Sequence, residues 1–249
     1  MPRKIRYIHP VFAPEEVEPM RRYLDEYRQP DTELSIVGLS SNAKVKRLDY
    51  GYYQAFVGME ILSAVKKAEQ DGCDAAIIGC FDDPFLREAK EISGSMAVVG
   101  LAESALHLAS VLGDSFGIVC VEEKDRAQFR NLVRQYGCDH RFLSIQPLGL
   151  SVPELQKDGN ATARRMEECI RTLVEDQSAE VVVLGCSMMF GFYKEMQERY
   201  SVPIIDSALS ALKFAEYLTD VAQGPGWKIS RRCAFQAPPK EEMRAWGLE

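Results

Sequence analysis

The sequence lacks several features that would assign it to a specialised class of protein. No apolar run approaches the roughly 20 residues of a membrane-spanning helix, and the basic residues Arg3, Lys4 and Arg6 are not followed by a signal-peptide core. None of the seven cysteines forms a Cys-x-x-Cys pair and only three histidines are present, which argues against a metal site. A net charge of −7 disfavours nucleic acid or an anionic membrane as partner. We therefore expect a soluble, cytoplasmic protein with free thiols.

The composition is that of an ordinary globular protein. Of the 249 residues, 46% are hydrophobic and 27% are charged, values well away from those of disordered chains. This length allows one large α/β domain or two small domains.

Two of the cysteines stand in a distinctive context. Cys80 and Cys186 each end a short aliphatic run, 75–79 and 181–185, and each follows a glycine. Such continuous apolar runs are typical of central parallel strands that are buried on both faces. The other five cysteines have no such context, and a free cysteine is most often a small buried apolar residue.

The two Gly-Cys pairs belong to a longer internal similarity. Residues 74–106 align without a gap to residues 180–212, at an offset of 106, with seven identities in 33 positions. The offset pairs Gly79 with Gly185 and Cys80 with Cys186. This register favours duplication of an α/β unit over chance similarity.

The hydrophobic pattern alternates strands and helices along the chain, which predicts parallel sheets. We predict an α/β fold of two pseudo-symmetric lobes, each a four-stranded parallel sheet flanked by helices, with the active site in the cleft between them. The expected lobes are residues 1–102 plus 208–249, and residues 103–207. We expect strands over Ile5–His9, Glu33–Leu39, 75–79, Met96–Gly100, Phe116–Val121, Phe142–Ile145, 181–185 and Val202–Asp206. We expect helices over Glu15–Arg28, 53–71, Pro84–Ile92, Leu106–Leu112, Glu123–Tyr136, 160–177, Gly191–Tyr200 and Ala208–Val221.

Two thiols on opposite sides of one ligand can exchange a proton on a carbon atom. Ligands of open parallel sheets bind beyond the carboxyl ends of the strands, so an approximate twofold would bring Cys80 and Cys186 to a common cleft. A thiolate on one side would remove a proton and the thiol on the other side would replace it. Backbone N–H groups after each strand would lower the pKa of the thiols, whereas Asp82 and Asp83 would oppose ionisation of Cys80.

The motifs resemble those of the hydantoin racemase family, within the aspartate/glutamate racemase superfamily. The resemblance is carried by the segments 79–84 and 184–189 around the two cysteines, by Val99–His107, by Pro203–Asp206 and by Phe235–Pro238. It implies a cofactor-independent enzyme that racemises a 5-substituted hydantoin or allantoin through Cys80 and Cys186. We also expect a homo-oligomer.

Several residues depart from the family pattern where the substrate would bind. His9-Pro10-Val11 replaces the usual Asn-Pro-Asn, Asp82 replaces a glycine, and Ser187-Met188-Met189 replaces small residues. Cys120 stands where a Ser or Thr is common, and Tyr52 lies in an aromatic element. The predicted substrate-binding set is therefore His9, Tyr52, Phe81, Asp82, Cys120, Ser187 and Met188. Structural roles remain open for His9, Tyr52 and Cys120.

Two other functions are compatible with this pattern. The first is an isomerase or decarboxylase of a small dicarboxylate, although related decarboxylases keep only one of the two cysteines. The second is a small-molecule binding protein that retains the cleft without turnover.

Overall fold

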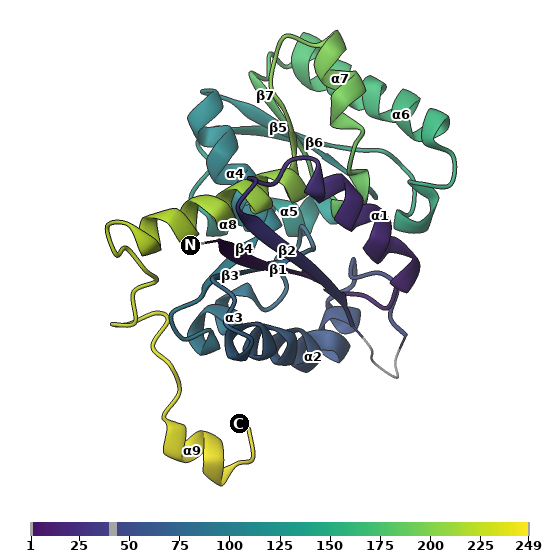
Figure 1. Cartoon of the computed structure of the whole chain (residues 1–249). Coiled ribbons are helices and arrows are strands. Elements are labelled where there is room, and N and C mark those ends of the chain that lie inside the picture. Colours follow the sequence, from purple (N-terminus) through teal and green to yellow (C-terminus); the bar gives the residue numbers. More distant parts are fainter. Residues whose placement is uncertain (1, 40–43, 249) are drawn as a thin grey trace.

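The computed structural model describes residues 2–39 and 44–248 and contains two similar sheets (Figure 1). The first sheet has the strand order β2-β1-β3-β4 and the second the order β6-β5-β7-β8, with all pairs parallel. The strands are β1 (Arg3–His9), β2 (Thr32–Gly38), β3 (Ala75–Ile78), β4 (Ala97–Gly100), β5 (Phe116–Cys120), β6 (Phe142–Pro147), β7 (Val181–Leu184) and β8 (Ile204–Asp206). The predicted α/β architecture of two four-stranded parallel sheets is confirmed.

Helices connect the strands and cover both sheets. They are α1 (Pro14–Asp25), α2 (Gly51–Gln70), α3 (Leu86–Ile92), α4 (Leu101–Leu112), α5 (Asp125–Gln135), α6 (Gly159–Arg171), α7 (Tyr193–Arg199), α8 (Ser207–Gln223) and α9 (Lys240–Ala245). Short 3₁₀ turns occupy Val152–Glu154 and Ser187–Met189. Of the helices in the described residues, none has both the length and the apolarity to cross a bilayer.

The structure differs from the sequence-based expectation at three helices. Helix α4 begins at Leu101, five residues before the expected start at Leu106. The helix expected over 160–177 is regular only to Arg171 and continues as a π-turn, Thr172–Asp176. The tail contains α9, whose Met243 lines a surface groove together with Met59, Leu62 and Lys66 of α2, while Trp246 is exposed. No helix was expected in the tail. None of the residues of α9 is buried, so its sequence shows no clear apolar face of the kind that predicts a helix.

Alternate residues of the strands pack into different cores. In β3, Ala75 and Ile77 belong to a central core shared by both lobes, whereas Ala76 and Ile78 face α2 and α3. In β7, Val181 and Val183 belong to the central core and Val182 and Leu184 to an outer one. Successive side chains of a strand point to opposite faces, so each sheet places one face against the other lobe.

Helices α4 and α8 pack against each other within the central core. Their buried alanines are related by the offset of 106: Ala102, Ala105 and Ala109 on α4 and Ala208, Ala211 and Ala215 on α8. Small side chains at this spacing form one helix face and allow two helices to approach closely. α4 contacts β7 and β8, while α8 contacts β1, β3 and β4. Lobe boundaries at residues 102 and 208 stay a prediction.

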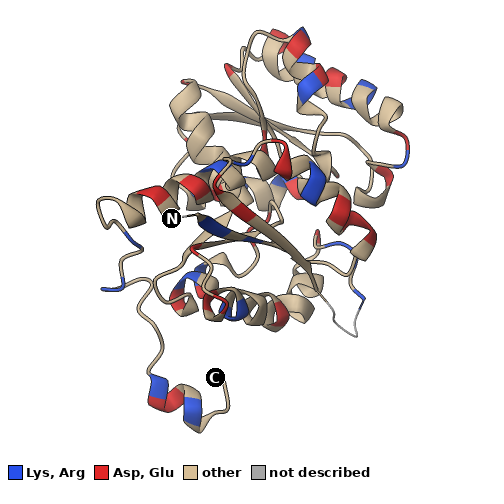
Figure 2. Cartoon of the chain, in the orientation of Figure 1, with Lys and Arg blue, Asp and Glu red and all other residues tan. Residues whose placement is uncertain are grey.

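Charged residues of both signs occur along the same surface helices, as α1 and α2 illustrate in Figure 2. This mixture agrees with a protein of modest net negative charge, −7 over 249 residues.

Candidate active site

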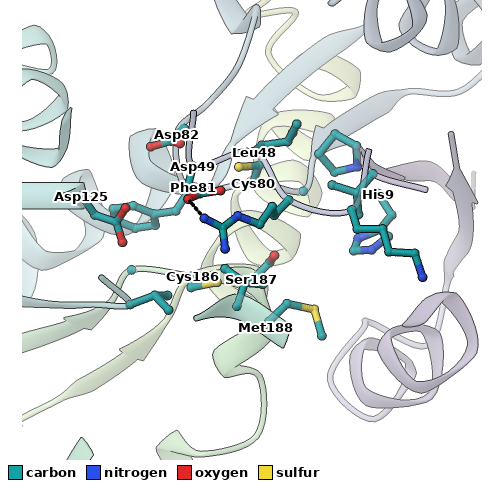
Figure 3. A pocket seen from close by; sticks show the side chains of 18 of the residues that line it. His9, Leu48, Asp49, Cys80, Phe81, Asp82, Asp125, Cys186, Ser187 and Met188 are labelled. Atoms are coloured by element: carbon teal, nitrogen blue, oxygen red, sulfur yellow. Dashed lines mark hydrogen bonds and ion pairs between the residues drawn. The ribbon is translucent and has the colours of Figure 1, made fainter. Parts of the chain in front are cut away.

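Cys80 and Cys186 follow two equivalent strands, β3 and β7, and line one pocket between the lobes. A glycine precedes each cysteine because the backbone there is packed closely. A Cβ atom on Gly79 would lie 2.3 Å from the ring of Tyr7, and one on Gly185 would lie 2.9 Å from the carbonyl oxygen of Val119. Figure 3 shows the side chains of the two cysteines on opposite sides of the pocket. The pocket encloses about 590 Å³, counted out to its open mouth.

Both thiols have raised pKa values. Burial is the main cause for each. The neighbouring Asp82 carboxylate adds to the shift of Cys80, while the backbone N–H of Asp82 opposes it. For Cys186 the pKa is raised to about 12, and the backbone N–H of Met188 opposes the shift. The expected N–H donors are therefore present, but burial outweighs them and both groups rest as thiols.

His9 closes one side of the pocket at the end of β1. Its ring is only 2% exposed, and its Nε2 lies 2.9 Å from Oε2 of Glu16 on α1. Its Nδ1 has no partner in the described part of the chain. This nitrogen is available to a ligand, since His9 lines the pocket.

The loop before α2 supplies pocket residues that the sequence reasoning missed: Lys46, Arg47, Leu48 and Asp49. Arg47 Nη2 donates to Asp49 Oδ2 at 2.8 Å, and Arg47 Nη1 lies 3.5 Å from Oε1 of Glu122 in the other lobe. Lys124 donates to the backbone carbonyl of Asp49. These contacts join the loops of the two lobes at the pocket. Two adjacent cationic residues, Lys46 and Arg47, were the feature of the sequence that could have identified this loop as part of the pocket.

The second lobe also contributes residues that were not predicted. Asp125 begins α5, and Phe129 on the same helix packs against Phe81, with the ring centroids 4.8 Å apart and the ring planes tilted by 52°. Both Asp125 and Phe129 line the pocket, together with Val121 and Val152. Asp125 Oδ2 accepts a hydrogen bond from the backbone N–H of Glu122 at 2.8 Å, which fixes its carboxylate.

Most of the predicted substrate-binding residues lie together. His9, Phe81, Asp82, Ser187 and Met188 line the pocket with the two cysteines. This arrangement places five candidate contacts within reach of a ligand held between the thiols.

Two predicted residues lie elsewhere. Tyr52 on α2 is 71% exposed and packs edge-on against Phe56. Cys120 is fully buried in the central core, with its Sγ 3.3 Å from the carbonyl oxygen of Glu122. Neither is among the residues that line the pocket, so their role in substrate binding stays an untested prediction.

Known proteins share the sequence and the fold of this chain. The Asp/Glu/hydantoin racemase family matches residues 15–215. A hydantoin racemase of Pseudomonas sp. (strain NS671) is 32% identical over 192 residues, 77% of this chain and 75% of the relative. A hydantoin racemase of Paenarthrobacter aurescens is 31% identical over 78% of this chain and 81% of its own.

Solved structures agree with these matches. An allantoin racemase from Klebsiella pneumoniae superposes with a TM-score of 0.87 at 27% identity, covering 95% of this chain and 94% of its own. An allantoin racemase from Pseudomonas fluorescens gives a TM-score of 0.86 at 20% identity, covering 94% of this chain and 97% of its own, and shows the shared fold.

Proposed function

Because this chain belongs to the Asp/Glu/hydantoin racemase family, we propose that it racemises a 5-substituted hydantoin or allantoin by a two-thiol mechanism. The observation that carries the proposal is the pair of cysteines, Cys80 and Cys186, which line one pocket from equivalent strand ends. A carbon between a carbonyl group and a nitrogen, as in a hydantoin ring, has a proton acidic enough for this chemistry.

The proposed reaction moves one proton off the ring carbon and another onto it. The thiolate of one cysteine takes the proton, the C–H bond breaks, and its electron pair moves toward the adjacent carbonyl oxygen as an S–H bond forms. The thiol of the other cysteine then gives its proton to the opposite face of the carbon. The carbonyl is restored, the configuration is inverted, and the two cysteines have exchanged protonation states.

The neighbouring residues have distinct tasks in this proposal. The backbone N–H groups of Asp82 and Met188 favour the thiolates of Cys80 and Cys186, respectively. Phe81, packed against Phe129, provides an apolar wall for the ring. His9, Ser187 and Met188 contact the substrate from the remaining sides. Burial disfavours ionised thiols, so the reaction uses the small fraction of enzyme that holds one thiolate.

The experiment is a substrate panel with two readouts. Purified protein is incubated in deuterium oxide with single enantiomers of allantoin, 5-benzylhydantoin and 5-isobutylhydantoin. We expect decay of optical rotation together with incorporation of deuterium at the ring carbon. Binding of the panel compounds without either change would refute racemisation and leave a binding protein. A small dicarboxylate of the malonate type is incubated in parallel, and its loss of carbon dioxide would instead support a decarboxylase.

The proposal includes a cytoplasmic homo-oligomer that needs no cofactor. Racemisation should persist after dialysis against a chelator without added cofactors, and light scattering should report more than one chain per particle. Loss of activity on dialysis, restored by a metal or an organic cofactor, would contradict the cofactor-independent reaction.

A further inference from the structure

One end of the pocket is lined by three aspartates from separate segments. Asp49 comes from the loop before α2, Asp82 from the loop after β3, and Asp125 from the start of α5. Figure 3 shows them gathered on the side of the pocket away from His9 and close to the two cysteines. A substrate held between the thiols would therefore direct one of its groups toward these three carboxylates, here called the acidic end.

The protein satisfies these carboxylates only in part. Asp82 Oδ2 accepts from Nε2 of Gln54 at 2.9 Å, Asp125 Oδ2 from the N–H of Glu122, and Asp49 Oδ2 from Arg47. The side chain of Asp49 is 9% exposed, yet its Oδ1 has no hydrogen-bond partner among residues 2–39 and 44–248. A buried carboxylate oxygen without a donor is costly. This atom, in a residue that lines the pocket, marks a place for a donor from the ligand.

The charges at this end favour a positive ligand group. Arg47 and Lys124 are the cations at Asp49, with Lys124 Nζ 3.5 Å from Oδ2. Facing them are the three aspartates and Glu122, which is 3.5 Å from Arg47. Burial, and next the charge of Asp125, raise the pKa of Asp82 to about 7, as expected where carboxylates crowd together. In the described residues no cluster of His, Cys, Asp or Glu is arranged to hold a metal ion.

We propose that the acidic end binds a cationic substituent of the substrate, so that this enzyme prefers hydantoins whose 5-substituent ends in a guanidinium or an ammonium group. This inference rests on the proposed racemase function and adds a substrate class to it. Asp49 Oδ1 and the Asp82 carboxylate accept N–H bonds from the substituent, while the ring carbon lies between Cys80 and Cys186. The contact between Arg47 and Asp49 already shows a guanidinium on this carboxylate, and charge-assisted bonds of this kind are the strong ones.

The test compares two substrates that differ at one position. 5-(3-Guanidinopropyl)hydantoin and 5-(3-ureidopropyl)hydantoin have nearly the same shape. They differ at the end of the side chain, where the charged =NH₂⁺ of the guanidinium group is replaced by the neutral carbonyl oxygen of the urea group. We expect kcat/KM for the guanidino compound to exceed that for the ureido compound by about 10-fold or more in the wild type. In Asp49→Asn and in Asp82→Asn the ratio should fall toward one. Asp139→Asn, an exposed position beyond α5, makes the same charge change as a control and should keep the wild-type ratio.

The outcomes separate the subsite from the racemase activity. A wild-type ratio of one or less, or a ratio kept in both pocket variants, overturns the acidic-end proposal even if both compounds are racemised. If no hydantoin and no allantoin is racemised, the proposed function fails instead, and calorimetry with the same two compounds decides the subsite. Tighter binding of the guanidino compound, lost in Asp82→Asn, supports the proposal; equal binding or none refutes it. Circular dichroism shows whether each variant is folded. If Asp49→Asn does not fold, the result for Asp82→Asn alone decides the test.

Discussion

Helices α4 and α8 both begin beside the central core, and at each start a carboxylate accepts hydrogen bonds from the free backbone N–H groups. The two carboxylates come from different positions in their lobes. At α8 the capping residue is Asp206, whose Oδ1 accepts from the N–H groups of Ala208 and Leu209 at 2.9 and 3.0 Å. At α4 the equivalent residue is Gly100, and Asp83 accepts from the N–H groups of Ala102 and Glu103 at 3.0 and 2.8 Å. The duplicated scaffold thus preserves the cap but not the residue that makes it.

The absence of a side chain at Gly100 allows Asp83 to cap α4 in place of the residue at position 100. A Cβ atom there would lie 2.4 Å from the carboxyl carbon of Asp83, so only glycine admits that carboxylate. Each cap is also bound by a tyrosine of the opposite lobe: Tyr136 donates to Asp83 at 2.7 Å and Tyr23 to Asp206 at 2.6 Å. The interface between the lobes is therefore held by two matched pairs that a sequence alignment of the lobes does not reveal.

The surroundings of the two thiols differ in a way that bears on chemistry. The offset of 106 pairs Asp82, two residues after Cys80, with Met188, two residues after Cys186. One thiol thus has a carboxylate beside it and the other a thioether. The two similar lobes each place a thiol at the pocket, and the local sequence makes the surroundings of the two thiols unequal.

The largest expected effect tests whether each thiol serves one face of the substrate. Cys80→Ser and Cys186→Ser should each lower racemisation by about 10²–10⁴-fold, because a positioned acid or base is lost. Each variant should still exchange deuterium into the enantiomer that faces its remaining thiol, and the two should select opposite enantiomers. Proton NMR of each enantiomer in deuterium oxide measures this. Selection of the same enantiomer by both variants would contradict two-sided proton transfer.

The next effect compares the reactivity of the thiols. Cys80 and Cys186 are partly buried with raised pKa values, whereas Cys233 is exposed. At pH 8, iodoacetamide should alkylate Cys233 faster than either pocket thiol by about 10-fold or more, since only thiolates react. Cys186 should be the faster of the pocket pair because Asp82 lies beside Cys80. Peptide mass spectrometry over time gives all three rates; equal rates for Cys80 and Cys233 would be inconsistent with the raised pKa.

A smaller effect is expected at the two tyrosine–aspartate pairs. Tyr23→Phe and Tyr136→Phe each remove one hydrogen bond to a buried carboxylate and should each lower the free energy of unfolding by about 1–2 kcal/mol. Urea denaturation measures the loss. Tyr217→Phe, at a side chain that is 59% exposed, is the matched control and should change stability little. If only one of Tyr23→Phe and Tyr136→Phe were destabilising, the two pairs would not be equivalent in strength.

The smallest effect concerns the pH dependence of stability at Asp82. Its pKa is raised to about 7 in the folded protein, mainly by burial and then by Asp125, so folding favours the protonated form. The wild type should therefore lose stability as the pH rises from about 4 to about 7. Asp82→Asn removes this loss and should be more stable than the wild type at pH 8 by about 1 kcal/mol, after allowance for solvent in the open pocket.

Melting temperatures at pH 5 and pH 8 provide the readout for Asp82. The gain from Asp82→Asn should be larger at pH 8, and Asp139→Asn should show no such pattern. A gain that is equal at both values would mean that Asp82 is not neutral in the folded protein at low pH. Met188, the equivalent residue of the second lobe, cannot titrate, so the effect of Asp82 has no counterpart at the equivalent position beside Cys186.

Prediction from the sequence succeeded where local pattern decides structure. The aliphatic runs before Cys80 and Cys186 identified β3 and β7, since residues buried on both faces of a parallel sheet must be apolar. The constant offset identified the repeated sheets. By contrast, Arg47, Asp49 and Asp125 carry no periodic signal, because they lie in a loop or at a helix start whose position depends on the packing of both lobes.

The sequence by itself determined the fold class, the duplication and the two thiol-bearing strand ends, because glycine, cysteine and aliphatic runs act through short-range rules of backbone and burial. Only the tertiary structure decided which groups surround those thiols. It placed Cys120 in the core, left Tyr52 in solvent, and brought three aspartates from distant segments to one end of the pocket. Burial and the approach of charges depend on distances through space, which positions along a chain do not specify.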